Sequence, residues 1–532
     1  MVTTSKREAQ GENGLVAAGS PEASQAGVAV LKQGGNAVDA AVAASLALGA
    51  SAPVFSGIGG GGFMLVHLAG TPGGAIIDYR ERAPRRATED MYRLDAQGDV
   101  VDAENEIGYK AAAVPGTLAG LALALERYGT MPLSKVAQGA ISAARDGAKV
   151  GQRLAYLMAQ NHDDSLTKLR TMAEAGKSLL KPDGSTFQEG ETFVQRDLAA
   201  SLGRIAEEGV EAFYEGFVAD ALDKDMAANG GLMDKEDLRT YQPVEREPLT
   251  GQFQGLEFVT MPPPSSGGIA LIQLFGIFDG LDLQATGFNT PETIDRMAKV
   301  LGQVFPDRGR VGDPEFVDVP VGELTSRQHV DKLAKDALGG VMAGSGPDDH
   351  TQTTHLSVVD RAGNAVALTE SLESFFGSGV VVPGTGIFLN NTMHDFDPAP
   401  GGPNSVGAGK RPMSSMSPTI FFKDGQPRLV LGSAGGPRII TAVLQVALNV
   451  LVHGMGLQEA ISAPRFHFQS GLLTLETSLA AEVGDALRGR GYRLREHHDH
   501  DYFFGGVNAI QVRDGVFVGG ADPRRDGVVV AY

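Results

Sequence analysis

One junction near the middle of the chain places the strongest constraint on its fold. Residues 344–352 are polar and rich in turn-forming residues, and they run directly into an alternating apolar pattern. Such alternation is typical of core strands, which we expect at 353–360 and, after a short turn, at 365–372. Thr353 is therefore expected where an irregular loop enters a buried strand.

This position suits a nucleophile that is released by self-cleavage. Cutting the Gln352–Thr353 bond would free an α-amine beside the Thr353 hydroxyl. An α-amine titrates near pH 8, so it can act as a base close to neutrality, and a threonine paired with its own amine is a known activated nucleophile. On these residues alone, the more ordinary interpretation is that Thr353 and Thr354 are β-branched strand residues. The rest of the chain has to decide.

Composition limits the classes of function. The 532 residues suggest two or three structural units, and the 71 glycines indicate many tight turns. The chain has no cysteine, which excludes disulfides, thiolate metal sites and a cysteine nucleophile. A net charge of −19 argues against nucleic acid or an anionic membrane as a partner. We expect no cofactor and no metal.

Neither a targeting segment nor a membrane segment is recognisable. Residues 1–11 are polar and lack the apolar core of a signal peptide, and no apolar run is long enough to cross a bilayer. We therefore expect a cytoplasmic protein, or a periplasmic or secreted one if a signal has been removed.

Helices and strands alternate in the pattern of a mixed fold. Ser20 and Pro21 predict a helix start, and Asn36 with Asp39 forms a capping box before a second, buried helix. Apolar strand runs with helices on either side suggest sheets between helical layers. Further helices are expected near 116–128, 196–208, 216–229, 269–280, 290–303, 437–452 and 479–490, and strands near 63–68, 75–80, 251–261, 386–390, 418–423 and 427–432.

A glycine-rich stretch at 56–62 matches the dinucleotide-binding fingerprint in spacing only. Gly57, Gly59 and Gly62 fit the pattern, but the stretch follows a helix and opens a strand. The fingerprint must follow a strand and open a helix. We predict instead that this backbone approaches another chain segment or a ligand closely.

Arg80 and the pair Gly435-Gly436 each have two interpretations. Arg80, at a strand end, is either a solvated surface charge or a guanidinium that grips a carboxylate. Gly435 and Gly436 form either a plain helix-start turn or a pair of free N–H groups that hold an oxyanion, with the helix dipole behind them.

From about Gly19 to Gln469, the chain resembles one family in a series of short stretches that occur in the same order. This family is the gamma-glutamyltransferases (gamma-glutamyltranspeptidases), which belong to the N-terminal nucleophile hydrolases. The resemblance implies an α+β fold, a four-layer αββα sandwich, and self-cleavage into a large subunit, 1–352, and a small catalytic subunit, 353–532. The matching stretches are 34–41, 56–62, 78–81, 114–116, 263–268, 353–355, 389–391, 410–419 and 432–436.

The resemblance also implies roles for single residues. It makes Thr353 the nucleophile and Gln352–Thr353 the cleavage site. It assigns the substrate α-carboxylate to Arg80 and the α-amino group to Asp395. The remaining implied positions are the hydroxyl helpers Ser414 and Ser415 and the oxyanion-hole pair Gly435 and Gly436.

The chain departs from the family pattern at three places. Ser371 stands where the family usually has a second active-site threonine, and Glu373 stands where many members have asparagine. The segment 397–409 is shorter than in members with a substrate-covering lid. The run 376–384, together with Glu373, also resembles the cephalosporin-acylase-like branch. Glu373 either helps to hold an α-ammonium group or points away and pairs with a surface base.

The expected function follows from these parts. A threonyl acyl-enzyme would form from glutathione or a related γ-glutamyl amide, and water, an amino acid or a peptide would accept the acyl group. Hydrolysis is favoured, because a lid that excludes water is not expected. One alternative is a glutaryl or cephalosporin-type acylase, whose donor lacks the α-amine. The other is an uncleaved, non-catalytic homologue that acts as a binding protein.

Overall fold

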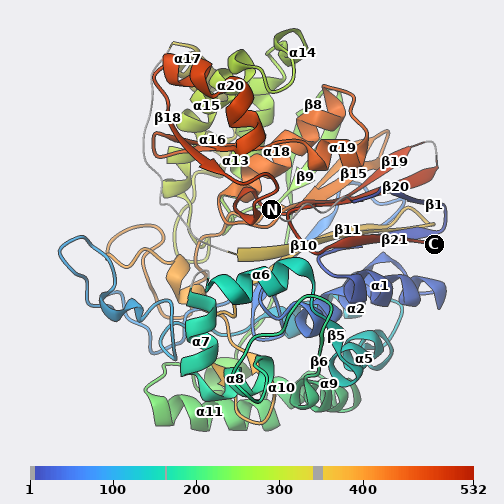
Figure 1. The fold of residues 1–532 in the computed structure, drawn as a ribbon, viewed down its shortest axis with the longest axis vertical. Helices are drawn as coiled ribbons and strands as arrows, with labels where there is room; N and C mark the ends of the chain where they lie inside the picture. Colours follow the sequence, from blue (N-terminus) through green and yellow to red (C-terminus); the bar gives the residue numbers. More distant parts are fainter. Residues whose placement is uncertain (1–5, 162–163, 340–351, 514) are drawn as a thin grey trace.

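The protein is built around two seven-stranded antiparallel sheets that lie face to face between two layers of helices (Figure 1). The computed structural model describes residues 6–161, 164–339, 352–513 and 515–532. Most of the predicted loop at 344–352 lies outside these residues, and only Gln352 is described. The four-layer αββα architecture expected from the sequence is confirmed.

The first sheet contains the strand that begins at Gln352. Its order is β21 (Val528–Ala531), β2 (Gly14–Ala18), β10 (Gln352–Asp360), β11 (Ala365–Glu373), β3 (Gly61–His67), β4 (Ala75–Asp78) and β7 (Val244–Arg246). The second sheet has the order β1 (Ala9–Gly11), β20 (Val516–Ala521), β19 (Asn508–Arg513), β15 (Gln426–Gly432), β14 (Thr419–Lys423), β9 (Leu256–Thr260) and β8 (Leu249–Phe253).

Each sheet is covered by helices on its outer face (Figure 1). The helices on the first sheet include α1 (Pro21–Lys32), α2 (Ala37–Ser51), α3 (Thr117–Tyr128), α5 (Gln138–Asp146), α9 (Arg196–Glu208) and α11 (Phe217–Asn229). Those on the second sheet include α13 (Gly267–Phe278), α15 (Pro291–Val304), α17 (Arg327–Leu338), α18 (Arg438–Leu451) and α20 (Thr477–Gly489). Among the described residues, none of the helices combines the length and apolarity needed to cross a membrane.

The alternation of side chains along the strands divides the core into two parts. In β2, Val16 packs toward α1 and α2, whereas Leu15 packs into the core between the two sheets. In β10, Leu356 and Val358 likewise face the helices. Successive strand residues point to opposite faces, so a strand covered on both sides must be apolar on both. Every residue of β10 and β11 is buried for this reason.

The predicted helix starts are confirmed by their capping bonds. The Ser20 side chain accepts a hydrogen bond from Ala23 N–H, with Pro21 as the first helical residue. Asn36 and Asp39 form the predicted capping box at the start of α2. These local signals are strong because each one satisfies backbone donors that the first helical turn leaves unpaired.

The glycine stretch before β3 makes the close backbone approach that its context predicted. A Cβ atom at Gly59 would lie 2.0 Å from the carbonyl oxygen of Phe388, and one at Gly60 would lie 2.1 Å from that of Ser371. Real Cβ atoms do not approach so closely, so only glycine fits at these two positions. This close packing seats the stretch on β11 beside Ser371.

The strand expected at 386–390 is much shorter than predicted. Only β13 (Ile387–Phe388) is a strand. The chain leaves it because the Asn390 side chain donates to the carbonyl oxygens of Gly59 and Ala113, each at 2.8 Å. Side-chain bonds of this kind compete with a strand ladder and give no periodic signal in the sequence.

Glu370 in β11 provides a test of how this core is packed. Its carboxylate is buried against α2 and accepts a hydrogen bond of 2.6 Å from Ser45. Burial raises the pKa of Glu370 from 4.5 to about 7, although the bonds from Ser45 and Ser56 oppose the rise. A group with a raised pKa stabilises the fold below its unfolded pKa, and this contribution is lost as the pH rises from 4.5 through about 7.

We expect Glu370→Gln to be more stable than the wild type at pH 8, by up to about 3 kcal/mol, and to lose this advantage at pH 5. Glutamine keeps the shape and the acceptor for Ser45 but cannot ionise. Urea unfolding at both pH values measures the difference. Glu482→Gln, on the exposed face of α20, is the control and should show no such pH dependence. A stability gap for Glu370→Gln that does not change with pH would contradict this account.

Candidate active site

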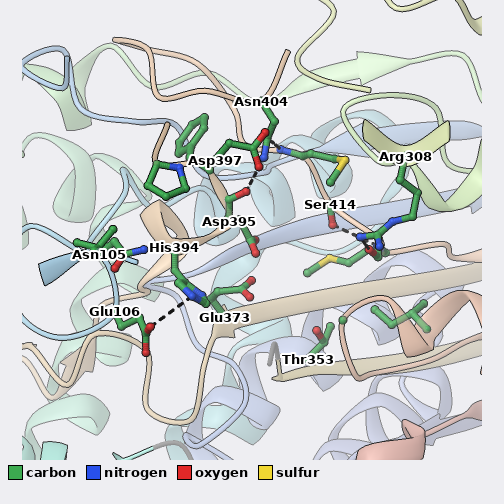
Figure 2. A pocket seen from close by; sticks show the side chains of 18 of the residues that line it. Asn105, Glu106, Arg308, Thr353, Glu373, His394, Asp395, Asp397, Asn404 and Ser414 are labelled. Atoms are coloured by element: carbon green, nitrogen blue, oxygen red, sulfur yellow. Dashed lines mark hydrogen bonds and ion pairs between the residues drawn. The ribbon is translucent and has the colours of Figure 1, made fainter. Parts of the chain in front are cut away.

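A cavity of about 600 Å³ opens at the start of β10 (Figure 2). Its walls come from segments that are far apart in the sequence. The lining residues are Gly98, Asp99, Val100, Asn105, Glu106, Arg308, Thr353, Glu373, His394, Asp395, Phe396, Asp397, Pro398, Asn404, Met413, Ser414, Ser415, Met416, Gly436 and Ile439. Six residues predicted from the sequence thus share one cavity, namely Thr353, Glu373, Asp395, Ser414, Ser415 and Gly436.

Thr353 lies at an irregularity in the pairing of β10 with β11. Gln352 pairs with Glu373, but Thr354 pairs with Glu370, so the register shifts across Thr353. Such bulges are common beside active sites because they turn a side chain out of the regular ladder. Thr353 is 2% exposed and lines the cavity.

Ser371 lies behind Thr353 and contacts the bond that was predicted to be cleaved. Its hydroxyl donates a hydrogen bond of 2.5 Å to the carbonyl oxygen of Gln352 and accepts one of 2.7 Å from the Glu373 N–H. The second bond occupies the oxygen as an acceptor and so directs the proton toward Gln352. A donor at this place polarises the carbonyl group that a Thr353 attack would need.

A buried ionic cluster forms the wall behind Asp395. Arg80 contacts three carboxylates: Asp395 through Nη2, Glu81 at 3.5 Å and Glu373 at 3.9 Å. Arg80 is therefore not a solvated surface charge. Among the described residues, the ionic partner of Glu373 is Arg80 in this cluster and not a surface base. It also has a φ of 85°, which is unusual for a residue other than glycine and typical of functional sites.

The cluster holds more negative than positive groups, and the pKa values reflect this. Burial and the neighbouring Asp395 raise the pKa of Glu373 well above its ordinary range. Burial raises the pKa of Glu81 to about 7, although Arg80 opposes the rise. Burial works against the charge on Arg80, but Asp395, Glu81 and Glu373 outweigh it and raise its pKa. A further cation in the cavity would be favoured beside Glu373 and Asp395.

The predicted oxyanion pair lies where the chain enters α18. Gly435 has a φ of 109° and Gly436 a φ of 56°, and the first α-helical residue is Arg438. In the part of the chain that the structure describes, neither glycine N–H donates a hydrogen bond to a backbone carbonyl. Gly436 lines the cavity. Two N–H groups at a helix start can hold an oxyanion.

Sequence reasoning missed several lining residues. Arg308 comes from the 3₁₀ helix η3 (Phe305–Arg310), and its Nη2 donates to the Ser415 hydroxyl at 2.9 Å. The Nε2 atom of His394 lies 3.5 Å from a carboxylate oxygen of Glu106, on one side of the cavity. Both residues lie on short 3₁₀ helices, which are too short for a periodic pattern to mark a functional side chain.

The segment 397–409 lies in the cavity wall. Asn404 holds it there, because its Nδ2 donates to the Asp395 carbonyl at 2.7 Å and its Oδ1 accepts from Met413 N–H at 2.7 Å. Within the described ranges, no group of three or more histidine, aspartate or glutamate residues is arranged to hold a metal ion.

Comparison with known proteins identifies relatives along almost the whole chain. The family model described as "Gamma-glutamyltranspeptidase" matches residues 23–532. The "Glutathione hydrolase proenzyme" of Escherichia coli is 40% identical, over 98% of this chain and 92% of that protein. The "Acylase ACY 1 proenzyme" of Pseudomonas sp. (strain V22) is also 40% identical, over 99% of this chain and 95% of that protein.

A solved structure agrees with these relatives. The crystal structure of cephalosporin acylase from Bacillus halodurans aligns with a TM-score of 0.86 at 29% identity, over 99% of this chain and 97% of that one. The fold and the sequence thus point to the same group of proteins.

The bond between Ser371 and Gln352 generates a prediction about self-cleavage. We expect Ser371→Ala to slow cleavage at Gln352–Thr353 about a hundredfold or more, because the loss of one donor to a reacting carbonyl oxygen has this effect in comparable sites. Ser371→Thr keeps the hydroxyl and should still cleave. Gel electrophoresis of freshly purified protein over time measures the rate, and sequencing of the smaller fragment should begin with Thr-Thr-His.

Two variants complete this experiment. Thr353→Ala should remain a single chain, since it lacks the attacking hydroxyl. Ser374→Ala removes a nearby buried hydroxyl that bonds Asn391 rather than Gln352, and should cleave at the wild-type rate. Normal cleavage of Thr353→Ala at this bond, or of Ser371→Ala at the wild-type rate, would contradict the role given to these hydroxyls.

Proposed function

Because the chain belongs to the gamma-glutamyltranspeptidase family, which is a family of enzymes, we propose that it is a self-processing hydrolase and transferase of γ-glutamyl amides. Glutathione and related γ-glutamyl compounds are the proposed donors. Cleavage before Thr353 would give a large chain, 1–352, and a small chain, 353–532. Both would line the cavity, since Arg308 belongs to the first and Asp395 to the second.

The observation that carries this proposal is the division of charge around Thr353. Glu373 and Asp395 line one part of the cavity, and Arg308 with the hydroxyls of Ser414 and Ser415 lines another. A γ-glutamyl group ends in an α-amino acid, with one ammonium and one carboxylate. The carboxylate-rich part suits the ammonium, and the part with Arg308 suits the carboxylate.

In this mechanism, the Thr353 hydroxyl attacks the donor amide carbonyl while its own α-amine takes the proton. The N–H groups of Gly435 and Gly436 hold the oxyanion. The amine then returns the proton to the leaving nitrogen, the C–N bond breaks, and an ester of Thr353 remains. Water, or the amine of an amino acid or peptide, attacks this ester and restores the hydroxyl.

Arg80 and Asp395 would exchange partners when the donor binds. Each is the other's closest ionic partner in the free protein. When Asp395 pairs with the ammonium of a zwitterionic head, Arg80 would become accessible. It would then share the carboxylate of the head with Ser414, Ser415 and Arg308, so that both charges stay paired. The exchange then leaves no buried charge unpaired, so it avoids the large free-energy cost of an unpaired charge in a desolvated site.

Hydrolysis is the favoured outcome in this proposal. The segment 397–409 is short and held in the wall by Asn404, and lids that exclude water require a mobile covering segment. Water would therefore reach the acyl-enzyme more readily than in an enzyme with a lid.

A second candidate is an acylase for donors without the α-amine. It is supported by the 40% identity to the acylase of Pseudomonas sp. and by the similarity to the cephalosporin acylase of Bacillus halodurans. A glutaryl donor would leave Glu373 and Asp395 without the ammonium that the first proposal gives them. The uncleaved binding protein is the third, and the cleavage experiment above tests it.

Glu373→Gln separates the first two candidates. We expect the wild type to favour γ-glutamyl-p-nitroanilide over glutaryl-p-nitroanilide. The variant keeps the shape but cannot ionise beside the α-ammonium, so its KM for the γ-glutamyl donor should rise about tenfold. Its KM for the glutaryl donor should stay the same or fall, because a repulsive carboxylate is gone. Initial rates of p-nitroaniline release measure both.

Glu106→Gln is the matched control, since Glu106 lines the same cavity but pairs with His394 rather than contacting Arg80. This variant should change the KM for both donors by the same factor. The assignment of Glu373 to the α-amine fails if Glu373→Gln affects both donors equally or neither. A wild type that turns over only the glutaryl donor would make the acylase the better description.

A further inference from the structure

Arg308 is the only arginine or lysine among the residues that line the cavity, all of which belong to the described part of the chain. It is 2% exposed and lies on η3. Arg80, by contrast, lies behind Asp395 and Glu373 and does not line the cavity. The positive charge at the cavity surface therefore comes from Arg308.

The bond between Arg308 and Ser415 has only one direction. A guanidinium group donates and cannot accept, so the Ser415 oxygen must accept from Nη2 at 2.9 Å. The proton of the Ser415 hydroxyl is then directed elsewhere, and Ser415 lines the cavity. Arg308 thus makes Ser415 a hydrogen-bond donor toward a ligand.

Arg308 is itself held in place. Its Nε donates to the Ser266 hydroxyl at 3.2 Å, and that hydroxyl donates to the Ser414 carbonyl at 2.9 Å. The backbone of Ser266 bonds the same carbonyl at 2.8 Å. The Arg308 side chain and the Ser414-Ser415 segment are therefore parts of one bonded unit, in which a side-chain direction is well defined.

The position of this unit identifies the kind of group that it would bind. Figure 2 shows Arg308 and Ser414 on the opposite side of the cavity from Asn105 and Glu106. The other ionisable lining residues are carboxylates or histidine, namely Asp99, Glu106, Glu373, His394, Asp395 and Asp397. A ligand carboxylate would be repelled along most of the wall and attracted at Arg308.

Arg80 bonds the same segment at Met413. Its Nη2 donates to the carbonyl of Met413 at 3.2 Å, one residue before Ser414. Residues 413–415 therefore bond one guanidinium group through Met413 and a second through Ser415.

We propose that Arg308 is a positioning residue that selects donors with a carboxylate: it fixes the Ser415 hydroxyl as a donor to this carboxylate and supplies positive charge beside it. The inference rests on the proposed function of the same cavity. It requires that the effect of Arg308 depends on the donor carboxylate, whether or not the donor also has an amine.

Three p-nitroanilide donors separate the two ends of the head group: γ-glutamyl, with amine and carboxylate; glutaryl, with carboxylate only; and 4-aminobutyryl, with amine only. We expect Arg308→Met to raise the KM for the γ-glutamyl and glutaryl donors about ten- to hundredfold, with a smaller change in kcat. The KM for the 4-aminobutyryl donor should change little. Arg308→Lys keeps a positive charge that can donate a hydrogen bond, so its KM values should rise less than those of Arg308→Met.

A double-variant cycle tests whether Arg308 acts through Ser415. Ser415→Ala should raise the KM for the carboxylate-bearing donors by a similar factor. In the double variant, Arg308→Met with Ser415→Ala, the KM should rise by less than the product of the two single factors. Arg310→Met is the control, because Arg310 lies on the same short helix but is exposed and pairs with Glu323. It should leave all three KM values near those of the wild type.

Self-cleavage and thermal unfolding of each variant report on folding, and Arg308→Lys serves where Arg308→Met does not fold. The inference would be overturned if Arg308→Met raised the KM equally for all three donors. It would also be overturned if the KM factors of Arg308→Met and Ser415→Ala simply multiplied in the double variant. Turnover by the wild type tests the proposed function separately, since a protein that accepts only the glutaryl donor would still show a carboxylate-dependent effect of Arg308.

Discussion

The antiparallel pairing of β10 with β11 is the interaction on which the site depends. It places Gln352 and Thr353 at the start of a strand buried on both faces, opposite Ser371 and Glu373. The shift of register across Thr353 turns this residue out of the ladder, and the Ser371 hydroxyl reaches the carbonyl of Gln352 across the same pair of strands. The two sheets and their helical layers keep this short stretch in one geometry. A slip by one residue would exchange the side chains that pack on the helices with those that pack between the sheets.

Charge around this stretch is unevenly divided, so the cavity has a negatively charged part and a positively charged part. Arg80 is enclosed by Glu81, Glu373 and Asp395, so it stabilises the carboxylates more than it presents charge to the cavity. Burial raises the pKa values of Glu81 and Glu373, and the neighbouring Asp395 adds to the rise. A bound ammonium would add a cation to this cluster. A buried charge is stabilised only when it is paired, so the free protein and the donor complex would differ mainly in which partners are paired.

Local signals predicted much of the fold. The caps at Ser20 and Asn36 and the strand pattern after Thr353 depend on neighbours in the sequence, and the structure confirms them. The short β13 was not predicted, because the bonds of Asn390 to Gly59 and Ala113 join distant segments. For the same reason, Arg308 and Asn404 were missed, since each acquires its partners from other segments only in the folded chain. The roles of the site residues and the division at Thr353 remain proposals drawn from the family.

The most direct test of the central claim is to locate the acyl group during turnover. The protein is mixed with a γ-glutamyl donor and quenched in acid within the first turnovers, and its peptides are then examined by mass spectrometry. The account predicts a glutamyl group on the peptide that begins with Thr353, and no such group in Thr353→Ala. Turnover without an adduct on this peptide, or with the adduct on a different residue, would contradict it.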